Sequence, residues 1–554
     1  MTERLTARRA ALRPATRDHT ATPPDADGAR PTARALAGRL ARRVTRRPDR
    51  PPSGAAGTGP SRRERWGLAG IVLLLFAAYT TYAWARHAKY ETTGFDLGIF
   101  DQVVRAYAHF DAPTSPLKGI GYDILGDHFH PILVVLVPLY WIWDDPRMLL
   151  TAQAALLAVS VLPVAAFVRR RFGARAALPV AFAYGACWPI EQAVHFDFHE
   201  IAFAVPLLAL LVDALDRRAL RTVVACCLLL LLVREDMGTV VILAGLLIAV
   251  RRPPDGASRR PLLLLGAALA AAGLAGYWLA TSVVIPALAP YGFTYWTFAA
   301  LGPDPVSALR TVALHPWRVA QLMVTPDVKF HTLVTIFYPT AFLALVSPYT
   351  LLTVPFLAER MLNDRPLLWE TNFHYTSVVA PIVVMGAVDT AARLVRRFPK
   401  ALGGFRVPGG RRVGLAAAFV AWTVGVVVFQ LAVQGSDYPV TGLWNGRVWG
   451  RNARWHGVHD VLPRIPPGEC VEADNQIAPQ LTRRDYVTRV TLSGGLATWI
   501  VLDMDRKDTG WQTPPPAEAL RVSISNGYRV VWREGVVVLL HKDVPVAPLC
   551  RGLY

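Results

Sequence analysis

The segment EQAVHFDFHE, residues 191–200, carries three carboxylates and two imidazoles between two strongly apolar runs. If the segment is helical, His195 and His199 are four residues apart and share a face. If it is extended, His195, Asp197 and His199 alternate onto one side instead. Both geometries bring the two imidazoles together, as a metal site requires. A solvated connecting loop is the alternative, because ionisable residues at a membrane surface cost little when they are wet.

A second polar segment, GDHFHP at 126–131, contains Asp127, His128 and His130. A turn capped by Asp127 would account for the carboxylate and the proline, but not for two histidines. We expect this turn to approach residues 195–199, so that side chains of both segments bind one divalent cation. The predicted metal ligands are Asp127, His128, His195, Asp197 and His199.

A third segment, TGFDLGIFDQ at 93–102, places Asp96 directly before a helix with apolar periodicity. An aspartate in this position is either the N-cap of the helix or a carboxylate held at the membrane surface as a general base or metal ligand. Both roles suit the same geometry, so the spacing leaves them open.

Two further segments place charges or an imidazole next to apolar runs. In LLLLLVREDMG, the triplet Arg234, Glu235 and Asp236 interrupts an apolar hairpin. Each half has only about 15 residues, so the triplet could lie below the lipid headgroups, where charges are paired or functional. Arg234 either joins a neighbouring carboxylate or binds a lipid phosphate bidentately. In ETNFHYTSVVAP, His374 and Tyr375 precede another apolar run, although tyrosine is also a common interfacial anchor.

The apolar runs around these segments indicate an integral membrane protein. Hydrophobic residues make up 53% of the 554 positions and charged residues only 18%. Runs of about 20 apolar residues match the hydrocarbon thickness of a bilayer. We predict an α-helical membrane fold with about eleven spans and an interfacial helix at 131–143. The predicted spans are 67–84, 147–168, 175–190, 201–216, 219–233, 237–250, 261–285, 331–346, 349–360, 375–392 and 413–434.

Positive charge is concentrated in the N-terminal segment and in short loops. Residues 1–65 contain sixteen Arg against six acids, and basic loops occur at 169–175, 217–221, 251–260 and 396–412. Because cytoplasmic loops are enriched in Lys and Arg, we predict a plasma-membrane protein with a cytoplasmic N-terminus. The segments described above then all lie on the extracytoplasmic face. No basic patch is interleaved with aromatic residues, so no nucleic-acid partner is expected.

The chain is expected to have three parts: a disordered Arg/Pro-rich cytoplasmic tail (1–65), a membrane domain (66–434) and a small extracytoplasmic α/β domain (435–554). In the last part, strands are predicted at 471–474, 486–492, 498–504 and 528–542, the final one a hairpin turning near Glu534 and Gly535. A helix is predicted at 514–525. An oxidising compartment would permit a disulfide between Cys470 and Cys550, whereas Cys187, Cys226 and Cys227 are expected to pack within spans.

Five motifs, in the order FDLGIFDQ, GDHFHP, HFDFHE, VREDMG and EADNQIAPQLTRR, together resemble the bacterial membrane family named domain of unknown function 2079. That family is similar to the GT-C superfamily of multi-span glycosyltransferases, which use polyprenyl-phosphate-linked sugars. The resemblance implies that an acidic residue of the first large external loop acts on the acceptor, and Asp96 occupies that place. The loop departs from a plain Asp-x-Asp or Glu-Asp pair, because the next carboxylate, Asp101, follows five residues later.

The predicted function is a GT-C-type membrane glycosyltransferase. It would move a sugar from a polyprenyl-phosphate donor to an envelope glycan, lipid or protein acceptor. Asp96 and Asp101 are the predicted catalytic residues, and a divalent cation is a candidate cofactor. The predicted substrate-binding residues are Arg234, Glu235, Asp236 and His374. The alternatives are a transporter or lipid-linked sugar flippase, which intramembrane charges would also suit, and a non-catalytic scaffold for envelope assembly.

Overall fold

The structure is a computed structural model. It describes residues 59–253, 256–289, 296–399, 405–406, 412–433, 438–493, 495–506 and 513–551. All of them belong to one compact unit, Asp49–Tyr554. The predicted disordered tail lies outside the described residues as far as position 58.

The first helix, α2 (Arg62–Ala88), begins before the predicted span at 67–84. A capping box starts it: the Ser61 side chain accepts from the Glu64 amide, and the Glu64 side chain accepts from the Ser61 amide. Glu64 also pairs with Arg169 at 3.1 Å. Residues 62–65, which were predicted to belong to the tail, are therefore helical.

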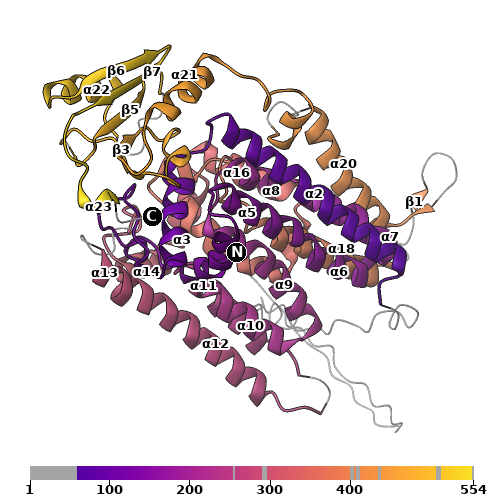
Figure 1. Cartoon of the computed structure of the whole chain (residues 1–554). Helices are drawn as coiled ribbons and strands as arrows, with labels where there is room; N and C mark the ends of the chain where they lie inside the picture. The colour runs from indigo at the N-terminus through magenta and orange to yellow at the C-terminus, as the bar shows by residue number, and fades with distance from the viewer. Residues whose placement is uncertain are drawn as a thin grey trace, which may run out of the picture. The chain divides into compact units, whose positions relative to one another are not determined.

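Most of the described chain is helical, as predicted (Figure 1). Among the described residues, three helices are long and apolar enough to cross a membrane: Arg62–Ala88, Arg147–Phe172 and Arg260–Leu288. Other predicted spans correspond to shorter helices, so their number stays a prediction. These helices are α7 (Ala174–Gly185), α9 (Ala204–Arg217), α10 (Leu220–Leu230), α11 (Met237–Ala249), α18 (Ala380–Arg397) and α20 (Leu415–Val433). Helix α8 (Trp188–His195) instead extends into the segment 191–200.

The remaining helices are shorter connecting elements. Helices α3 (Ile99–Ala108) and α4 (Val137–Ile142) belong to the first long loop, and α4 lies within the predicted interfacial helix. The others are α14 (Pro305–Leu314), α15 (Pro316–Val324), α16 (Asp327–Phe337), α17 (Val354–Leu362), α21 (Ala453–Val461), α22 (Pro516–Ser525) and α23 (Pro548–Arg551).

The two spans predicted at 331–346 and 349–360 are wrong as continuous helices. Helix α16 ends at Phe337, and the chain then turns through Ala341 and Phe342, whose φ angles are 49° and 57°. Short 3₁₀ turns follow before α17 begins at Val354. Pro339 and Pro348 contribute to this interruption, because proline has no amide proton to donate to the preceding helical turn.

Helices α11 and α12 (Arg260–Leu279) pack closely through glycine. A Cβ atom on Gly238 would lie 2.5 Å from the carbonyl oxygen of Gly273, and one on Gly245 would lie 2.4 Å from that of Gly266. Small residues allow helix backbones to approach in this way, as is common between membrane helices.

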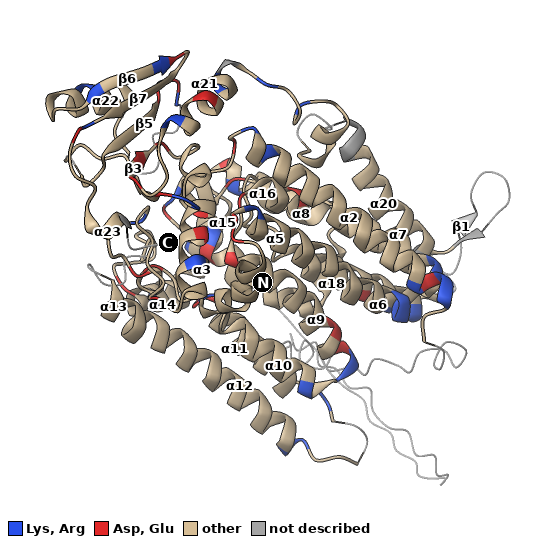
Figure 2. Ribbon diagram, viewed as in Figure 1, with Lys and Arg blue, Asp and Glu red and all other residues tan. Residues whose placement is uncertain are grey.

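Basic loops gather at one end of the helices (Figure 2). Arg171 forms ion pairs with Asp216 and with Asp389, the latter at 3.0 Å. Arg251 donates to the Leu215 carbonyl. Loops that are far apart in sequence, at 169–171, 215–217 and 251, therefore meet on one face, as the alternation of spans predicted.

The C-terminal part contains a five-stranded mixed sheet in the order β4-β3-β5-β7-β6. Its strands are β3 (Cys470–Ala473), β4 (Tyr486–Arg489), β5 (Trp499–Asp503), β6 (Arg529–Glu534) and β7 (Val537–His541). Every predicted strand is present, the hairpin turns at Gly535 with a φ of 55°, and α22 (Pro516–Ser525) is the predicted helix. Strands β1 (Phe405–Arg406) and β2 (Arg412–Val413) form a separate antiparallel pair.

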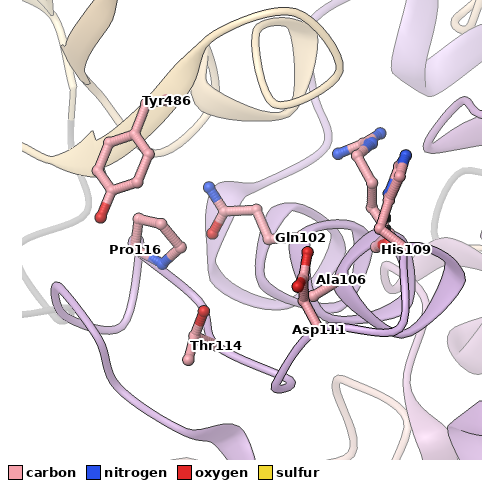
Figure 3. Close-up of a pocket in the computed structure, with 8 residues that line it drawn as sticks. Gln102, Ala106, His109, Asp111, Thr114, Pro116 and Tyr486 are labelled. Carbon is pink, nitrogen blue, oxygen red and sulfur yellow. Dashed lines mark hydrogen bonds between the residues drawn. The ribbon is translucent and has the colours of Figure 1, made fainter. Parts of the chain in front are cut away.

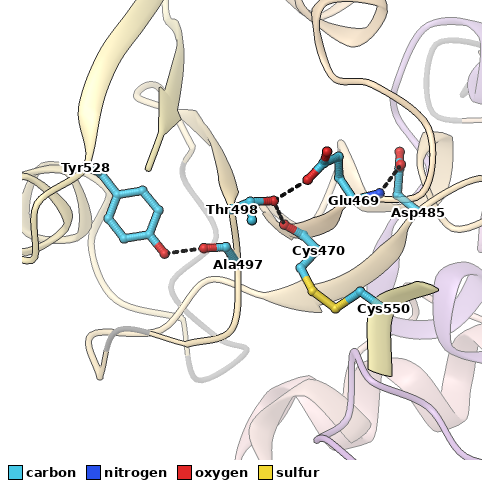
Figure 4. The surroundings of a disulfide bond; sticks show 7 residues. All are labelled: Glu469, Cys470, Asp485, Ala497, Thr498, Tyr528 and Cys550. Atoms are coloured by element: carbon cyan, nitrogen blue, oxygen red, sulfur yellow. Dashed lines mark hydrogen bonds between the residues drawn. A yellow bond between two sulfur atoms is a disulfide. The ribbon is translucent and has the colours of Figure 1, made fainter. Parts of the chain in front are cut away.

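A disulfide joins Cys470, the first residue of β3, to Cys550 in α23 (Figure 4). The two Cα atoms are 5.5 Å apart and 80 residues apart in sequence. Beside it, the Thr498 hydroxyl donates to Glu469 at 2.6 Å. The bond ties the end of the described chain to the sheet.

Candidate active site

Asp96 lies in η1 (Gly94–Gly98), a π-helical turn between α2 and α3, with a φ of 109°. The N-cap role is wrong: Gly98 is the residue before α3, and no side chain caps that helix. No described residue forms a hydrogen bond or ion pair with the Asp96 carboxylate. Although the side chain is partly accessible, burial raises its pKa to about 6, and Asp197 and Glu200 add to that rise while His199 opposes it. Asp96 thus combines a strained backbone with an unpaired carboxylate.

Asp197 supports the backbone just before this turn. Its carboxylate accepts from the amide and the hydroxyl of Thr93, both at 2.6 Å, and contacts Arg86 at 3.3 Å. Asp197 therefore positions the loop of Asp96 and has no geometry for binding a metal there.

Asp101 is bound on both oxygens by neighbouring side chains, which favours a structural role over the predicted catalytic one. It is completely buried, and its oxygens accept from Arg105 at 2.7 and 2.9 Å and from the Tyr140 hydroxyl at 2.7 Å. Arg105 in turn donates to Asp144 at 2.7 Å. The bidentate fork of Arg105 thus occupies both oxygens of the Asp101 carboxylate.

Close to Asp96, three side chains form a buried polar cluster that we name the His199 cluster: His199, Glu200 and His374. The Nδ1 atom of His199 is 2.6 Å from a carboxylate oxygen of Glu200, and the rings of His199 and His374 stack with centroids 4.1 Å apart. Glu200 is 0% exposed and His374 4%. From the described residues, no well-oriented hydrogen bond reaches either oxygen of Glu200 or either ring nitrogen of His374.

The charges of this cluster follow from burial and from its neighbours. Burial lowers the pKa of His374 far below its usual value, so the ring is neutral. Burial alone would raise the pKa of Glu200, but His199 and Arg234 outweigh it and lower that pKa, so Glu200 is ionised. A buried carboxylate and a neutral imidazole with unused bonding capacity are suited to bind a polar ligand.

The predicted substrate-binding triplet divides into two roles. Arg234 forms a bidentate pair with Asp236 at 2.8 and 2.7 Å, and its other terminal nitrogen is 3.7 Å from Glu200. Glu235 instead accepts from the Phe129 amide at 3.0 Å and pairs with His128 at 2.7 Å. Burial lowers the pKa of His128, but Glu235 outweighs it and raises that pKa to about 9. Glu235 thus fastens the turn at 126–131 to the triplet.

The five predicted metal ligands are not brought together. Asp127 pairs with Lys118 at 2.7 Å, and the Nδ1 atom of His195 lies 2.7 Å from the Tyr82 hydroxyl. His128, Asp197 and His199 each have the separate partners given above. Within the part of the chain that the structure describes, no group of three His, Cys, Asp or Glu residues is arranged to hold a metal ion. The predicted grouping fails because each segment pairs with a different neighbouring element.

A pocket adjoins Arg234. It is lined by Ile201, Arg234, Phe356, Glu359, Arg360, Leu368, Tyr375 and Val378. Glu359 lies 3.9 Å from Arg234. Glu200, Glu359 and Arg360 were not among the site residues predicted from the sequence. Glu200 is nevertheless one of the three carboxylates of the segment 191–200. Glu359 and Arg360 also left a signal, because a Glu-Arg pair within a predicted span is unusual.

A second pocket lies between α3 and β4 (Figure 3). One side is lined by Gln102 and Arg105 of α3 and by His109 directly after it, and the other side by Tyr486 of β4. Its remaining lining residues are Ala106, Asp111, Thr114 and Pro116. No motif in the sequence predicted this pocket, because it forms where two elements distant in sequence meet.

A family model described as predicted membrane protein (DUF2079) matches residues 86–538. The chain belongs to this family. It is a membrane protein, as its apolar helices also indicate. None of the curated proteins matches it.

Two solved structures are similar to the chain, both of ArnT from Cupriavidus metallidurans. The one bound to undecaprenyl phosphate has 16% sequence identity and a TM-score of 0.41, covering 84% of this chain and 97% of that chain. The apo structure has 15% identity and a TM-score of 0.38, covering 87% of this chain and 98% of that chain.

Proposed function

We propose that this protein is a membrane glycosyltransferase that moves a sugar from a polyprenyl-phosphate donor to a hydroxyl of an envelope glycan, lipid or protein. The observation that carries the proposal is Asp96: an unpaired carboxylate at a φ of 109°, beside a buried cluster with unused bonding capacity. Strained backbone is retained where the surrounding structure holds it, and such positions gather at functional sites. The donor class is inferred from the similarity of this family to the GT-C superfamily, whose enzymes use polyprenyl-phosphate-linked sugars.

In the proposed reaction, an acceptor hydroxyl oxygen attacks the anomeric carbon of the donor sugar. The bond from that carbon to the phosphate oxygen breaks, and its electron pair leaves with the polyprenyl phosphate. Asp96 takes the proton of the hydroxyl as a general base. Because burial raises the pKa of Asp96 to about 6, the carboxylate is ionised at neutral pH yet more basic than an ordinary aspartate.

The leaving phosphate is proposed to lie in the pocket beside Arg234. Arg234 lines this pocket, is held by Asp236 and has one terminal nitrogen 3.7 Å from Glu200. A fixed guanidinium stabilises negative charge that develops on a leaving oxygen. His374 lies close to Arg234 and Glu200, and we assign it to binding the sugar or phosphate oxygens. A divalent cation stays a candidate cofactor, although no group of three His, Cys, Asp or Glu among the described residues is arranged to hold one.

We place the site on the extracytoplasmic face, with the N-terminus in the cytoplasm. The basic loops on the opposite face support this orientation. Single cysteines introduced at Ser258 and Ser525 test it in whole cells. We expect a membrane-impermeant thiol reagent to label position 525 and not position 258. Labelling of position 258 alone would reverse the orientation.

The function is tested by sugar transfer in proteoliposomes from a polyprenyl-phosphate donor. We expect Asp96→Asn to lower turnover by about 10²–10⁴-fold, which is the usual contribution of a positioned general base. Asparagine is a suitable replacement because, like aspartate, it tolerates positive φ. Asp111→Asn, an exposed change in the same loop region, serves as the matched control.

Full activity of Asp96→Asn would contradict the proposed role of this residue. The rival function, a lipid-linked sugar flippase, gives a different result in the same vesicles. A flippase would move the intact donor across the bilayer without consuming it, and no free polyprenyl phosphate would appear.

A further inference from the structure

The motif EADNQIAPQLTRR, residues 472–484, belongs to the C-terminal sheet domain and has no part in the proposed chemistry. It nevertheless lies against the membrane domain. Gln480 donates to the His87 carbonyl at 3.0 Å, and Arg105 donates to the Thr482 carbonyl at 2.7 Å. Next to the motif, Gln102 donates to the Val487 carbonyl at 2.9 Å. The contacts join this segment to the end of α2 and to α3, on either side of the turn that carries Asp96.

Asn475 is the residue of this motif that reaches the turn itself. Its backbone carbonyl accepts from the Gly94 amide at 2.6 Å, and its side-chain oxygen accepts from the Phe95 amide at 2.9 Å. The two amides are consecutive and directly precede Asp96. Asn475 is only 5% exposed, so these bonds are shielded from competing water.

The packing at this contact leaves little freedom. A Cβ atom on Gly94 would lie 2.9 Å from the Cβ atom of Ala478 and 3.4 Å from the Asn475 carbonyl oxygen. Glycine is therefore required at position 94 for the turn to lie so close to the motif. On the other side, Thr93 is held by Asp197. Two domains thus fix three consecutive residues, 93–95, before the strained residue 96.

Asn475 is itself held firmly within the sheet domain. It follows β3, which is bonded to β4 and β5 on its two sides. The neighbouring Asp474 accepts from the Asp503 amide at 2.5 Å and pairs with Arg506. The Ile477 amide donates to the Asp474 carbonyl at 2.8 Å. The residue that contacts the turn of Asp96 therefore lies in a hydrogen-bonded turn that follows β3 closely, and not in a free loop.

We infer that Asn475 is a positioning residue, through which the C-terminal sheet domain holds Asp96 in its reactive orientation. The inference rests on the proposed function for its effect on turnover, but not for its effect on the turn. A residue at a φ of 109° keeps this conformation only while its neighbours enforce it. Loss of the bond to the Phe95 amide would let the turn relax and move the carboxylate away from the acceptor.

The first test measures the turn directly, without any activity assay. Hydrogen exchange of the peptide that covers 93–98 is compared between the wild-type protein and Asn475→Ala in the same detergent. We expect exchange to be at least about tenfold faster in the variant, with the peptides of β5 and β7 unchanged. Asn475→Asp keeps an oxygen acceptor for the Phe95 amide, and we expect it to restore slow exchange. Asn526→Ala, at the end of α22, is the matched control within the same domain.

The second test measures sugar transfer. We expect Asn475→Ala to lower kcat by about tenfold to a hundredfold, as a displacement of about 1 Å does, with KM for the donor unchanged. Unchanged exchange at 93–98 would overturn the inference, whatever the activity. If exchange is faster in Asn475→Ala but the wild-type protein transfers no sugar, the result would support the positioning of the turn and reject the proposed function. If Asn475→Ala cannot be purified, Gly94→Ala replaces it, because the added Cβ atom would push the turn away from the motif. Slow exchange at 93–98 in Gly94→Ala would then overturn the inference.

Discussion

Replacing Asp101 by Asn separates the structural role that we assign to this carboxylate from a catalytic one. In the wild-type protein, Asp101 accepts two bonds from Arg105 and one from Tyr140, and no part of its surface is accessible. Asparagine has a similar shape but no charge and only one acceptor oxygen. At least one N–H group of Arg105 would lose its acceptor, and the guanidinium would remain buried without its main counter-charge.

The size of this effect follows from the geometry. Removing one partner of a buried ion pair costs about 3–5 kcal/mol. Arg105 keeps Asp144 at 2.7 Å and the Thr482 carbonyl at 2.7 Å, and these partners soften the loss. We therefore expect Asp101→Asn to lower the free energy of unfolding by about 3 kcal/mol, at the lower end of that range.

The assay is denaturant titration of purified variants in one detergent, followed by sugar transfer per folded molecule. We expect Asp101→Asn to be destabilised but to retain most of its specific activity. Combining it with Arg105→Gln removes both charges, so the double variant should be more stable than the sum of the two single losses predicts. Wild-type stability of Asp101→Asn, or specific activity reduced by orders of magnitude, would refute the structural assignment.

Three further predictions concern the site and the sheet domain. Because burial raises the pKa of Asp96 to about 6, the rate of transfer should fall below pH 6 and level off above pH 7; a rate that is independent of pH between 5 and 7 would count against a base at this position. The pairing with Glu235 raises the pKa of His128 from 6.5 to about 9, so the stability that this pair contributes should be complete below pH 6.5 and lost as the pH rises through 9. Thermal unfolding at pH 6 and pH 9.5 measures that loss, which should be much smaller in Glu235→Gln. The disulfide closes a loop of 80 residues, so its removal by Cys550→Ser should lower the free energy of unfolding of the sheet domain by about 2–5 kcal/mol. Proteolysis of the sheet domain that is as slow in the variant as in the wild-type protein would contradict this estimate.

The sheet domain shows how far local patterns can predict structure. Each of its strands and the turn at Gly535 follow from alternation of apolar residues and from turn residues nearby in sequence. The segment 331–360 shows the limit of the same approach. Its composition is apolar enough for two spans, but the backbone breaks at Ala341 and Phe342, and mean hydropathy does not register such a break.

The candidate site was predicted in its parts but not in its pairings. The segments around Asp96, His199 and Arg234 were identified because carboxylates and imidazoles are unusual beside apolar runs. The expected metal site failed because Asp127 and His195 are bound by Lys118 and Tyr82. Those partners lie 9 and 113 residues away in the chain, and no spacing rule selects them.

By itself, the sequence determined that this is a helical membrane protein with a small sheet domain, which segments carry its ionisable residues, and to which family it belongs. The fold class and the polar segments depend on composition and on periodicity over a few residues, so they can be read locally. The family was inferred from the resemblance of five motifs. Only the tertiary structure decided that Asp101 is neutralised by Arg105 and that Asp96 is left unpaired. It also decided that Asn475 reaches Gly94 and Phe95 across 380 residues of sequence. The physical reason is that burial and pairing set the charge and reactivity of a side chain, and both depend on which distant elements pack against it.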